Sequence, residues 1–246
     1  MSRMSTSWFS DRVEREVQFA RWGDIGTPVL CFPTAGGDAE EVERMLMVDA
    51  LAPLMEAGRI KLYSVDSVPG NVWLREYNKP PYATRIQTAF DSFLINEALP
   101  VIYKDCGGPL DVVVAGASVG AFNALSAICR NPDRFSAAVC MSGTYDLAKF
   151  IDGEVDEDWY HASPLHFVPN LPEDHPILTG LRSRFVVLAH GQGRWEDSEE
   201  SWTVADVLGG QKIPNRVDEW GPEWDHDWPT WREMLPHYLD ELVPGK

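Results

Sequence analysis

The apolar positions of the chain fall into two patterns that alternate from the N-terminus to the C-terminus. Short, continuous apolar runs are typical of strands that are buried on both faces of a parallel sheet. Between them, apolar residues recur every three or four positions, which predicts amphipathic helices. The predicted strands are residues 27–33, 60–65, 111–115, 137–141, 185–189 and 216–220. The predicted helices are residues 41–57, 85–102, 121–130, one that includes 203–208, and 228–242.

This alternation predicts an α/β fold in which a mostly parallel central sheet has helices on both faces. No repeat, low-complexity tract or long linker divides the 246 residues, so one domain over residues 1–246 is expected, without a large separate lid domain. Residues 14–22 are predicted to add an edge strand. A functional site in such a sheet is expected at the carboxyl ends of the strands.

Residues 144–184 break the alternation, because they are irregular, acidic and proline-containing. An excursion of this length usually covers a site, so we expect it to wall the active site, with Trp159 and Tyr160 in the substrate pocket. An ordinary surface insertion is the alternative interpretation.

The net charge of −17 comes from 38 acidic and 21 basic residues. A negative field of this size disfavours nucleic acid, anionic membrane surfaces and anionic substrates as partners. The N-terminal segment lacks the features of a signal peptide, and no window reaches the roughly 18 consecutive apolar residues of a membrane span. The four cysteines are widely spaced without a CxxC pair. We therefore expect a cytoplasmic protein with reduced thiols.

The sequence GASVG, residues 116–120, is the first candidate for chemistry. It follows a β-branched run and precedes a helical pattern, which is the context of a nucleophile elbow. Such a turn holds a serine hydroxyl open to a base, and its crowded backbone requires very small residues such as Gly116 and Gly120. Ser118 is therefore the candidate nucleophile. A plain glycine turn between a strand and a helix fits the same five residues.

A serine nucleophile needs a general base, and on this fold the chain order is serine, then acid, then histidine. His226 lies between the last predicted strand and the last predicted helix, in a segment rich in tryptophan. It is therefore the candidate base. His190 ends the strand at residues 185–189 and would serve only in a different topology, whereas His237 lies within the last helix and is expected to be exposed.

The acid is expected in the segment that follows the strand at residues 185–189. Glu196 is the first candidate, and Asp197 is the alternative unless it caps the next helix, a position that suits aspartate. Asp146, after the preceding strand, is a third possibility. Asp225 and Asp227 adjoin the candidate base in sequence, but neighbouring side chains usually point apart.

An oxyanion hole needs two N–H donors. The Val119 N–H group lies at the start of a helix, where it points toward a developing negative charge. The second donor is expected in FPTAGGD, residues 32–38, whose small side chains leave the N–H group of Ala35 or Gly36 free. A simple turn is the other interpretation of this segment.

Residues 29–239 resemble the putative esterase, or esterase D-like, family of the α/β-hydrolase superfamily. PTAGG resembles the oxyanion loop of that family, GASVG its nucleophile elbow, and KIPNRVDEWG the strand before its histidine segment. DHDWPTWREMLPHYL, residues 225–239, resembles the histidine segment itself and is the most specific of these matches.

The resemblance implies Ser118 as nucleophile, His226 as base, and the backbones of Val119 and Ala35 as oxyanion donors. Most family members have aspartate where this chain has Glu196, so Asp197 stays open as the acid. Asp225 replaces the usual glycine before the histidine, where it would raise the pKa of the imidazole or face solvent.

The expected function is hydrolysis of small-molecule carboxylic esters or thioesters through an acyl-enzyme, with no metal and no cofactor. Acyl transfer to an alcohol would use the same triad, and a catalytically silent binding protein is the alternative from a different class. The sequence indicates neither the substrate nor the oligomeric state.

Overall fold

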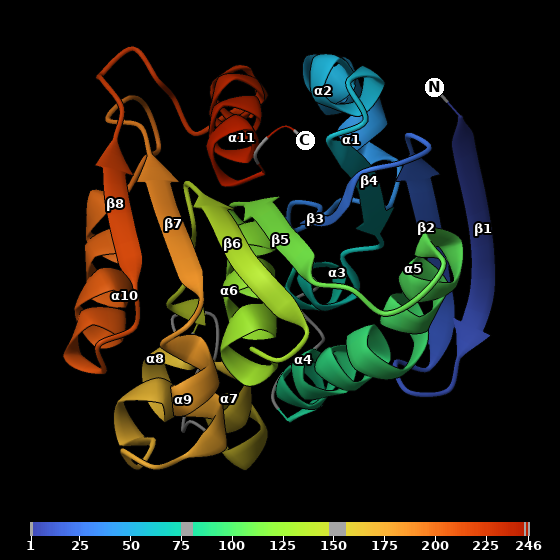
Figure 1. Cartoon of the computed structure of the whole chain (residues 1–246). Coiled ribbons are helices and arrows are strands. Elements are labelled where there is room, and N and C mark those ends of the chain that lie inside the picture. The colour runs from blue at the N-terminus through green and yellow to red at the C-terminus, as the bar shows by residue number, and fades with distance from the viewer. Residues whose placement is uncertain (1, 75–80, 148–155, 244, 246) are drawn as a thin grey trace.

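A single eight-stranded sheet runs through the computed structural model, which describes residues 2–74, 81–147, 156–243 and 245 (Figure 1). The strand order is β1-β2-β4-β3-β5-β6-β7-β8. The six strands from β4 to β8 in this order are parallel, whereas β1 and β2 pair antiparallel with each other and β2 pairs antiparallel with β4. The strands are β1 (Arg3–Ser10), β2 (Arg15–Trp22), β3 (Thr27–Phe32), β4 (Ile60–Val65), β5 (Val112–Ala117), β6 (Phe135–Met141), β7 (Phe185–His190) and β8 (Asn215–Glu219).

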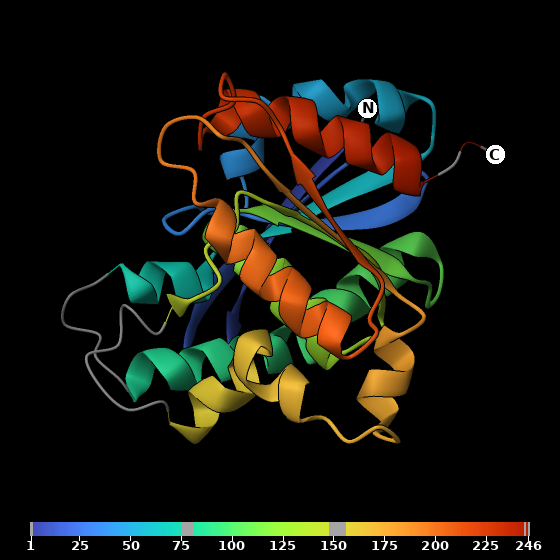
Figure 2. The ribbon, with the colours of Figure 1, turned by 90° about the vertical axis from the view of Figure 1, so that its left-hand side faces the viewer.

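Helices cover both faces of the sheet (Figure 2). One face carries α1 (Glu41–Arg44), α2 (Met47–Glu56) and α11 (Trp228–Leu242). The other carries α3 (Val68–Trp73), α4 (Tyr82–Phe93), α5 (Leu99–Cys106), α6 (Val119–Arg130) and α10 (Ser198–Gly210). Each face has its own buried core, which is why β4 and β5 are buried along their whole length.

The predicted strands and the helices at residues 121–130 and 228–242 are confirmed to within a few residues. The expected helix at residues 41–57 is two helices, because Leu46 has φ = 62° and interrupts the α conformation. The helix expected at residues 85–102 starts at Tyr82 and runs through a short π-helix, η1 (Leu94–Ala98), into α5.

The prediction of an edge strand at residues 14–22 is wrong in its position. β2 pairs on both sides, and β1 forms the edge of the sheet. β1 has the sequence RMSTSWFS and is largely exposed, so it lacks the apolar signal that reveals buried strands.

Residues 144–184 are not irregular throughout, contrary to expectation, although residues 148–155 lie outside the described residues. They contain three short helices and one turn of 3-10 helix: α7 (Glu157–Ala162), α8 (Pro164–Phe167), η3 (Val168–Asn170) and α9 (Pro176–Leu181). Elements this short show no usable helical period. Trp159 of α7 stacks on Phe122 of α6 at 5.5 Å between ring centroids, so this part of the excursion belongs to the core.

Candidate active site

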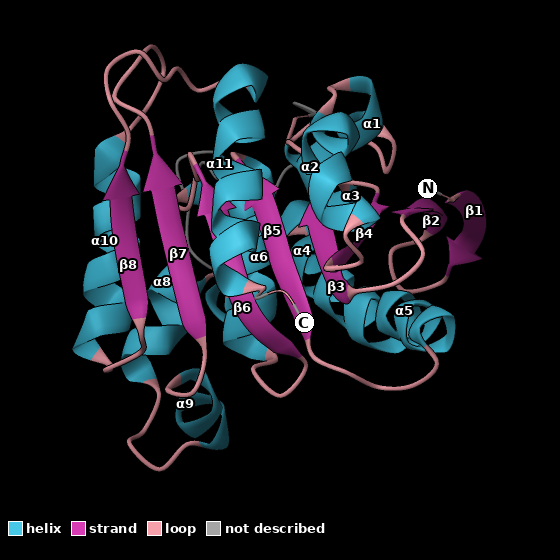
Figure 3. Ribbon diagram, turned by 45° about the horizontal axis from the view of Figure 1, so that its top comes forward, coloured by secondary structure: helices cyan, strands magenta, loops and turns pink. Residues whose placement is uncertain are grey.

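The carboxyl ends of the four strands β5 to β8 lie side by side, and the loops that follow them lie together there (Figure 3). We call this carboxyl-end side of the sheet the edge. Backbone hydrogen bonds continue the ladder beyond the strands. Ser118 N–H donates to Met141 O at 3.0 Å, Ser142 N–H to Ala189 O at 2.7 Å, and Gly193 N–H to Trp224 O at 2.9 Å. The segments that contain the candidate serine, acid and histidine therefore meet at the same edge.

Ser118 lies in the strand–turn–helix geometry expected of a nucleophile elbow. Its φ of 56° and ψ of −124° are unusual for a residue with a side chain, and the turn joins β5 directly to α6. A Cβ at Gly116 would lie 2.3 Å from the backbone of Gly120, and one at Gly120 would lie 2.5 Å from Phe32 O. Both glycines are therefore required by close backbone approach, as the motif demands.

Glu196 and His226 come together across the loops after β7 and β8. Glu196 Oε2 lies 3.7 Å from His226 Nδ1, and the glutamate side chain is only 3% exposed against 22% for the histidine. His226 N–H donates to Arg194 O at 3.0 Å, which ties the two loops together. Within the described residues, Ser118 Oγ and the His226 ring are not joined by a hydrogen bond.

The alternative acids are engaged elsewhere. Asp197 is the N-cap of α10 and accepts a hydrogen bond from Glu199 N–H at 3.1 Å, and Asp227 caps α11. Asp225 accepts from the backbone N–H and the guanidinium of Arg194 at 2.6–2.9 Å, and these hydrogen bonds hold the pKa of that carboxyl below its usual value.

Asp146 and the two other candidate histidines lie in different surroundings. Asp146 lines a surface cavity of about 430 Å³ together with Leu165 and His166. His190 is fully buried at the end of β7, where its Nδ1 lies 2.8 Å from Gly191 O. His237 is exposed on α11, as expected.

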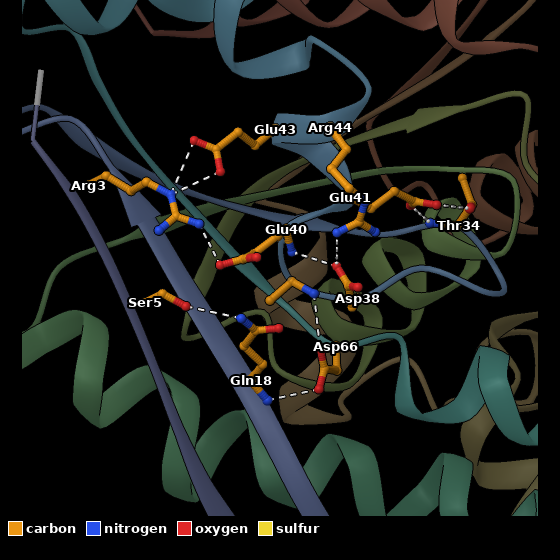
Figure 4. Close-up of polar contacts among 11 residues, drawn as sticks. Arg3, Ser5, Gln18, Thr34, Asp38, Glu40, Glu41, Glu43, Arg44 and Asp66 are labelled. Carbon is orange, nitrogen blue, oxygen red and sulfur yellow. Dashed lines mark hydrogen bonds and ion pairs between the residues drawn. The ribbon is translucent and has the colours of Figure 1, made fainter.

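The segment at residues 32–38 is a turn held by two carboxylates (Figure 4). Glu41 accepts from both the N–H and the hydroxyl of Thr34, each at 2.8 Å, and Asp66 accepts from Ala39 N–H at 2.9 Å. Burial raises the pKa of Asp66, against the opposing effect of its backbone donors. Gly37 N–H closes the turn on Thr34 O at 3.1 Å.

The turn at residues 32–38 and the start of α6 each leave one candidate oxyanion donor unused. Within the described residues, the N–H group of Ala35 has no acceptor, and that of Val119, as the first residue of α6, has no intrahelical acceptor. The backbone of Gly70 in α3 packs directly against Ala35, since a Cβ at Gly70 would lie 2.5 Å from Ala35 O. The segment is therefore a turn and also presents a free N–H group.

Tyr160 lies apart from this edge. It lines a cavity of about 370 Å³ beside Arg130, the last residue of α6, whereas Ser118 precedes the first residue of the same helix. Twelve helical residues span roughly 18 Å at 1.5 Å per residue. Tyr160 therefore lies at the end of α6 opposite Ser118, whereas Trp159 is buried in the core.

Four residues of this region were not predicted from the sequence: Glu41, Asp66, Ser142 and Trp231. Glu41 and Asp66 hold the turn at residues 32–38, as described above. Trp231 lies in the DHDWPTW stretch, but no local pattern indicates which partner its indole N–H group has. Ser142 directly follows β6, and position alone is the only signal that could have identified it.

No group of three or more His, Cys, Asp or Glu side chains among the described residues is arranged to hold a metal ion. The four cysteines are free thiols. Of the helices in the described ranges, none has both the length and the apolar character needed to cross a membrane.

Comparison with known proteins identifies the family. The sequence model described as "Putative esterase" matches residues 64–242, which is more than half of the chain, whereas no curated protein matches. Among solved structures, a ferulic acid esterase is 16% identical with a TM-score of 0.76, each chain being 98% covered. An S-formylglutathione hydrolase from Agrobacterium tumefaciens is 13% identical with a TM-score of 0.72, over 98% of this chain and 95% of that one.

A third similar structure is FphF, a fluorophosphonate-binding serine hydrolase of Staphylococcus aureus. It is 14% identical with a TM-score of 0.65, over 99% of this chain and 98% of that one. At these identities the structural likeness establishes the fold alone, and it confirms the α/β-hydrolase architecture. The chain belongs to the putative esterase family and is a carboxylic ester hydrolase.

Proposed function

We propose that this protein hydrolyses small-molecule carboxylic esters through an acyl-enzyme on Ser118, with His226 as general base and Glu196 as the acidic third member. The approach of a buried carboxylate to His226 carries the proposal, because Glu196 Oε2 lies 3.7 Å from the ring at the edge where the elbow serine also lies. The carboxylates of Asp197, Asp225 and Asp227 have other partners.

In the first half of the reaction, Ser118 Oγ attacks the ester carbonyl carbon and His226 Nε2 takes the hydroxyl proton. Glu196 faces Nδ1, so it holds the proton on that nitrogen and stabilises the imidazolium cation that forms. The carbonyl oxygen becomes an oxyanion, which accepts hydrogen bonds from the N–H groups of Val119 and Ala35.

The tetrahedral intermediate then collapses. The bond between the acyl carbon and the alkoxy oxygen breaks, and His226 returns its proton to the leaving alcohol. Water enters, gives a proton to the same nitrogen and attacks the acyl-enzyme, which releases the carboxylic acid and restores Ser118. Substrate binding must bring the hydroxyl and the imidazole into hydrogen-bond range, as is common for catalytic contacts that are long without ligand.

The experiment is labelling with a fluorophosphonate probe, read as a single mass adduct, together with hydrolysis of p-nitrophenyl acetate. We expect the wild type to label and to hydrolyse the ester, and Ser118→Ala to lose both while keeping its circular-dichroism spectrum. His226→Gln should label at least a hundredfold more slowly, because the serine loses its base. A correctly folded wild type that neither labels nor hydrolyses esters would overturn the proposal.

A further inference from the structure

We propose that Ser142 and Trp231 are positioning residues that hold the Glu196 carboxylate toward His226. This inference rests on the proposed function. Four contacts form a closed circuit through these four side chains, which come from the loops after β6, β7 and β8 and from α11. Trp231 Nε1 donates to Ser142 Oγ at 2.9 Å, and Ser142 Oγ donates to Glu196 Oε1 at 2.6 Å. Glu196 Oε2 faces His226 at 3.7 Å, and the rings of His226 and Trp231 meet edge to face at 5.3 Å.

The direction of each hydrogen bond follows from the chemistry of the donors. An indole N–H group can only donate, so Ser142 must accept from Trp231. The single hydroxyl proton of Ser142 is then free to point at Glu196, and a carboxylate can only accept. Trp231 therefore determines the orientation of the serine hydroxyl, and the serine determines the orientation of the carboxylate.

Burial makes these contacts consequential. Ser142 is 2% exposed, Trp231 is 4% exposed, and the side chain of Glu196 is 3% exposed, so water is largely excluded from the circuit. A buried carboxylate without donors is strongly disfavoured, and Ser142 supplies one charge-assisted hydrogen bond to it. Because Oε1 is held by Ser142, Oε2 is the oxygen left for His226.

The backbone at Ser142 supports a role for its side chain. Its φ of 44° lies in the left-handed region, where a residue with a side chain is strained and glycine is ordinarily preferred. Ser142 N–H bonds to Ala189 O, and two residues later Thr144 N–H bonds to Ser118 O at 3.3 Å. One short loop therefore contacts both the elbow and the acid.

The length of glutamate adds to the need for such a contact. Glutamate has one more rotatable bond than aspartate, so more side-chain entropy must be lost before its carboxylate stays in one orientation. Residues 191–195 approach the histidine loop closely, since a Cβ at Gly191 would lie 1.9 Å from Trp224 O. The loop backbone is thereby fixed, and Ser142 fixes the side chain that it carries.

The test is a double-mutant cycle of Ser142→Ala and Trp231→Phe, with kcat and KM measured on one ester. We expect each variant to lower kcat about tenfold while KM changes less than about twofold, as for loss of a hydrogen bond to a charged group. The double variant should be no slower than Ser142→Ala alone, because Trp231 acts through Ser142. Independent structural defects would instead multiply, and that result would overturn the relay.

Two matched controls use residues outside the circuit. Ser201→Ala removes a buried serine hydroxyl of α10 that has no hydrogen-bond partner within the described residues. Trp220→Phe removes an indole hydrogen bond to Tyr238 of α11. Both should keep kcat within about twofold of the wild type. Urea unfolding of every variant distinguishes a loss of stability from a misplaced Glu196 carboxylate.

A crystal structure of Ser142→Ala provides a readout that does not depend on activity. We expect the Glu196 carboxylate to rotate away from His226 Nδ1, and an unmoved carboxylate with unchanged kcat would overturn this proposal alone. If the folded wild type does not react with a fluorophosphonate, the proposed function fails, and any catalytic role of the circuit fails with it.

Discussion

Glu41 offers a sharp test of whether the turn at residues 32–38 supplies an oxyanion donor. Its two carboxylate oxygens accept the N–H and the hydroxyl of Thr34, the residue directly before Ala35 (Figure 4). Glu41→Ala removes both hydrogen bonds. At a net value of about 1.5 kcal/mol for each bond to a charged group, the variant should lose about 3 kcal/mol of unfolding free energy, or less where solvent compensates.

The same substitution should also lower the catalytic rate. Loss of one oxyanion donor typically lowers kcat about a hundredfold or more, and a released turn no longer holds Ala35 N–H in place. We therefore expect Glu41→Ala to lower kcat roughly a hundredfold with KM changed only a few fold. Glu41→Gln should be intermediate, because its amide oxygen can accept from Thr34 N–H while its amide nitrogen donates to the hydroxyl.

The assay is steady-state hydrolysis of p-nitrophenyl acetate, with urea unfolding monitored by tryptophan fluorescence. Glu40→Ala is the matched control, since Glu40 is the neighbouring glutamate and pairs with Arg3 across the surface. It should leave kcat unchanged. A folded Glu41→Ala variant with kcat within twofold of the wild type would refute the assignment of this turn to the oxyanion hole.

Three further predictions follow from the same structure. Glu196→Gln should lower kcat about a hundredfold or more, whereas Asp197→Asn, which alters only a helix cap, should leave kcat nearly unchanged; the reverse result would reassign the acid. Gly120→Ala should lower Tm in calorimetry by several degrees, because its Cβ would lie 2.5 and 2.6 Å from two backbone oxygens that cannot move away easily. An unchanged Tm would contradict this close approach. Burial raises the pKa of Asp66, so the free energy of unfolding should fall as pH rises through that pKa, and fall less in Asp66→Asn. The free energy of unfolding would be measured by urea titration at several pH values between about 4 and 7. An equal change with pH in the wild type and in Asp66→Asn would contradict this account.

The features that could be predicted from the sequence depend on contacts between near neighbours. The central strands are continuous apolar runs. The elbow and its two glycines lie within one stretch of five residues, 116–120. Asp197 was recognised as a possible cap from its residue type, and it does cap α10. The order of serine, acid and histidine follows from the order of the parallel strands, which the alternating pattern already indicates.

The features that could not be predicted depend on contacts between distant segments. Trp231 and Ser142 are 89 residues apart, and Ser142 and Glu196 are 54 apart, so nothing local pairs them. The short helices of residues 157–181 are stabilised by packing on α4 and α6 rather than by their own periodicity. β1 was missed because an exposed edge strand needs few apolar residues.

The acidic character of the chain opposes the stabilisation of a negative oxyanion at the proposed site, and local hydrogen bonds reduce this conflict. Three carboxylates that contact the proposed loops each bind donors of the protein itself. Glu41 takes both donors of Thr34, Asp66 takes two backbone N–H groups, and Asp225 takes Arg194. These carboxylates fix loops. The N–H group of Ala35 has no acceptor within the described residues and that of Val119 has no intrahelical acceptor, so both remain available to the proposed oxyanion. We expect the overall charge of −17 to act at longer range and to disfavour anionic esters relative to neutral or cationic ones.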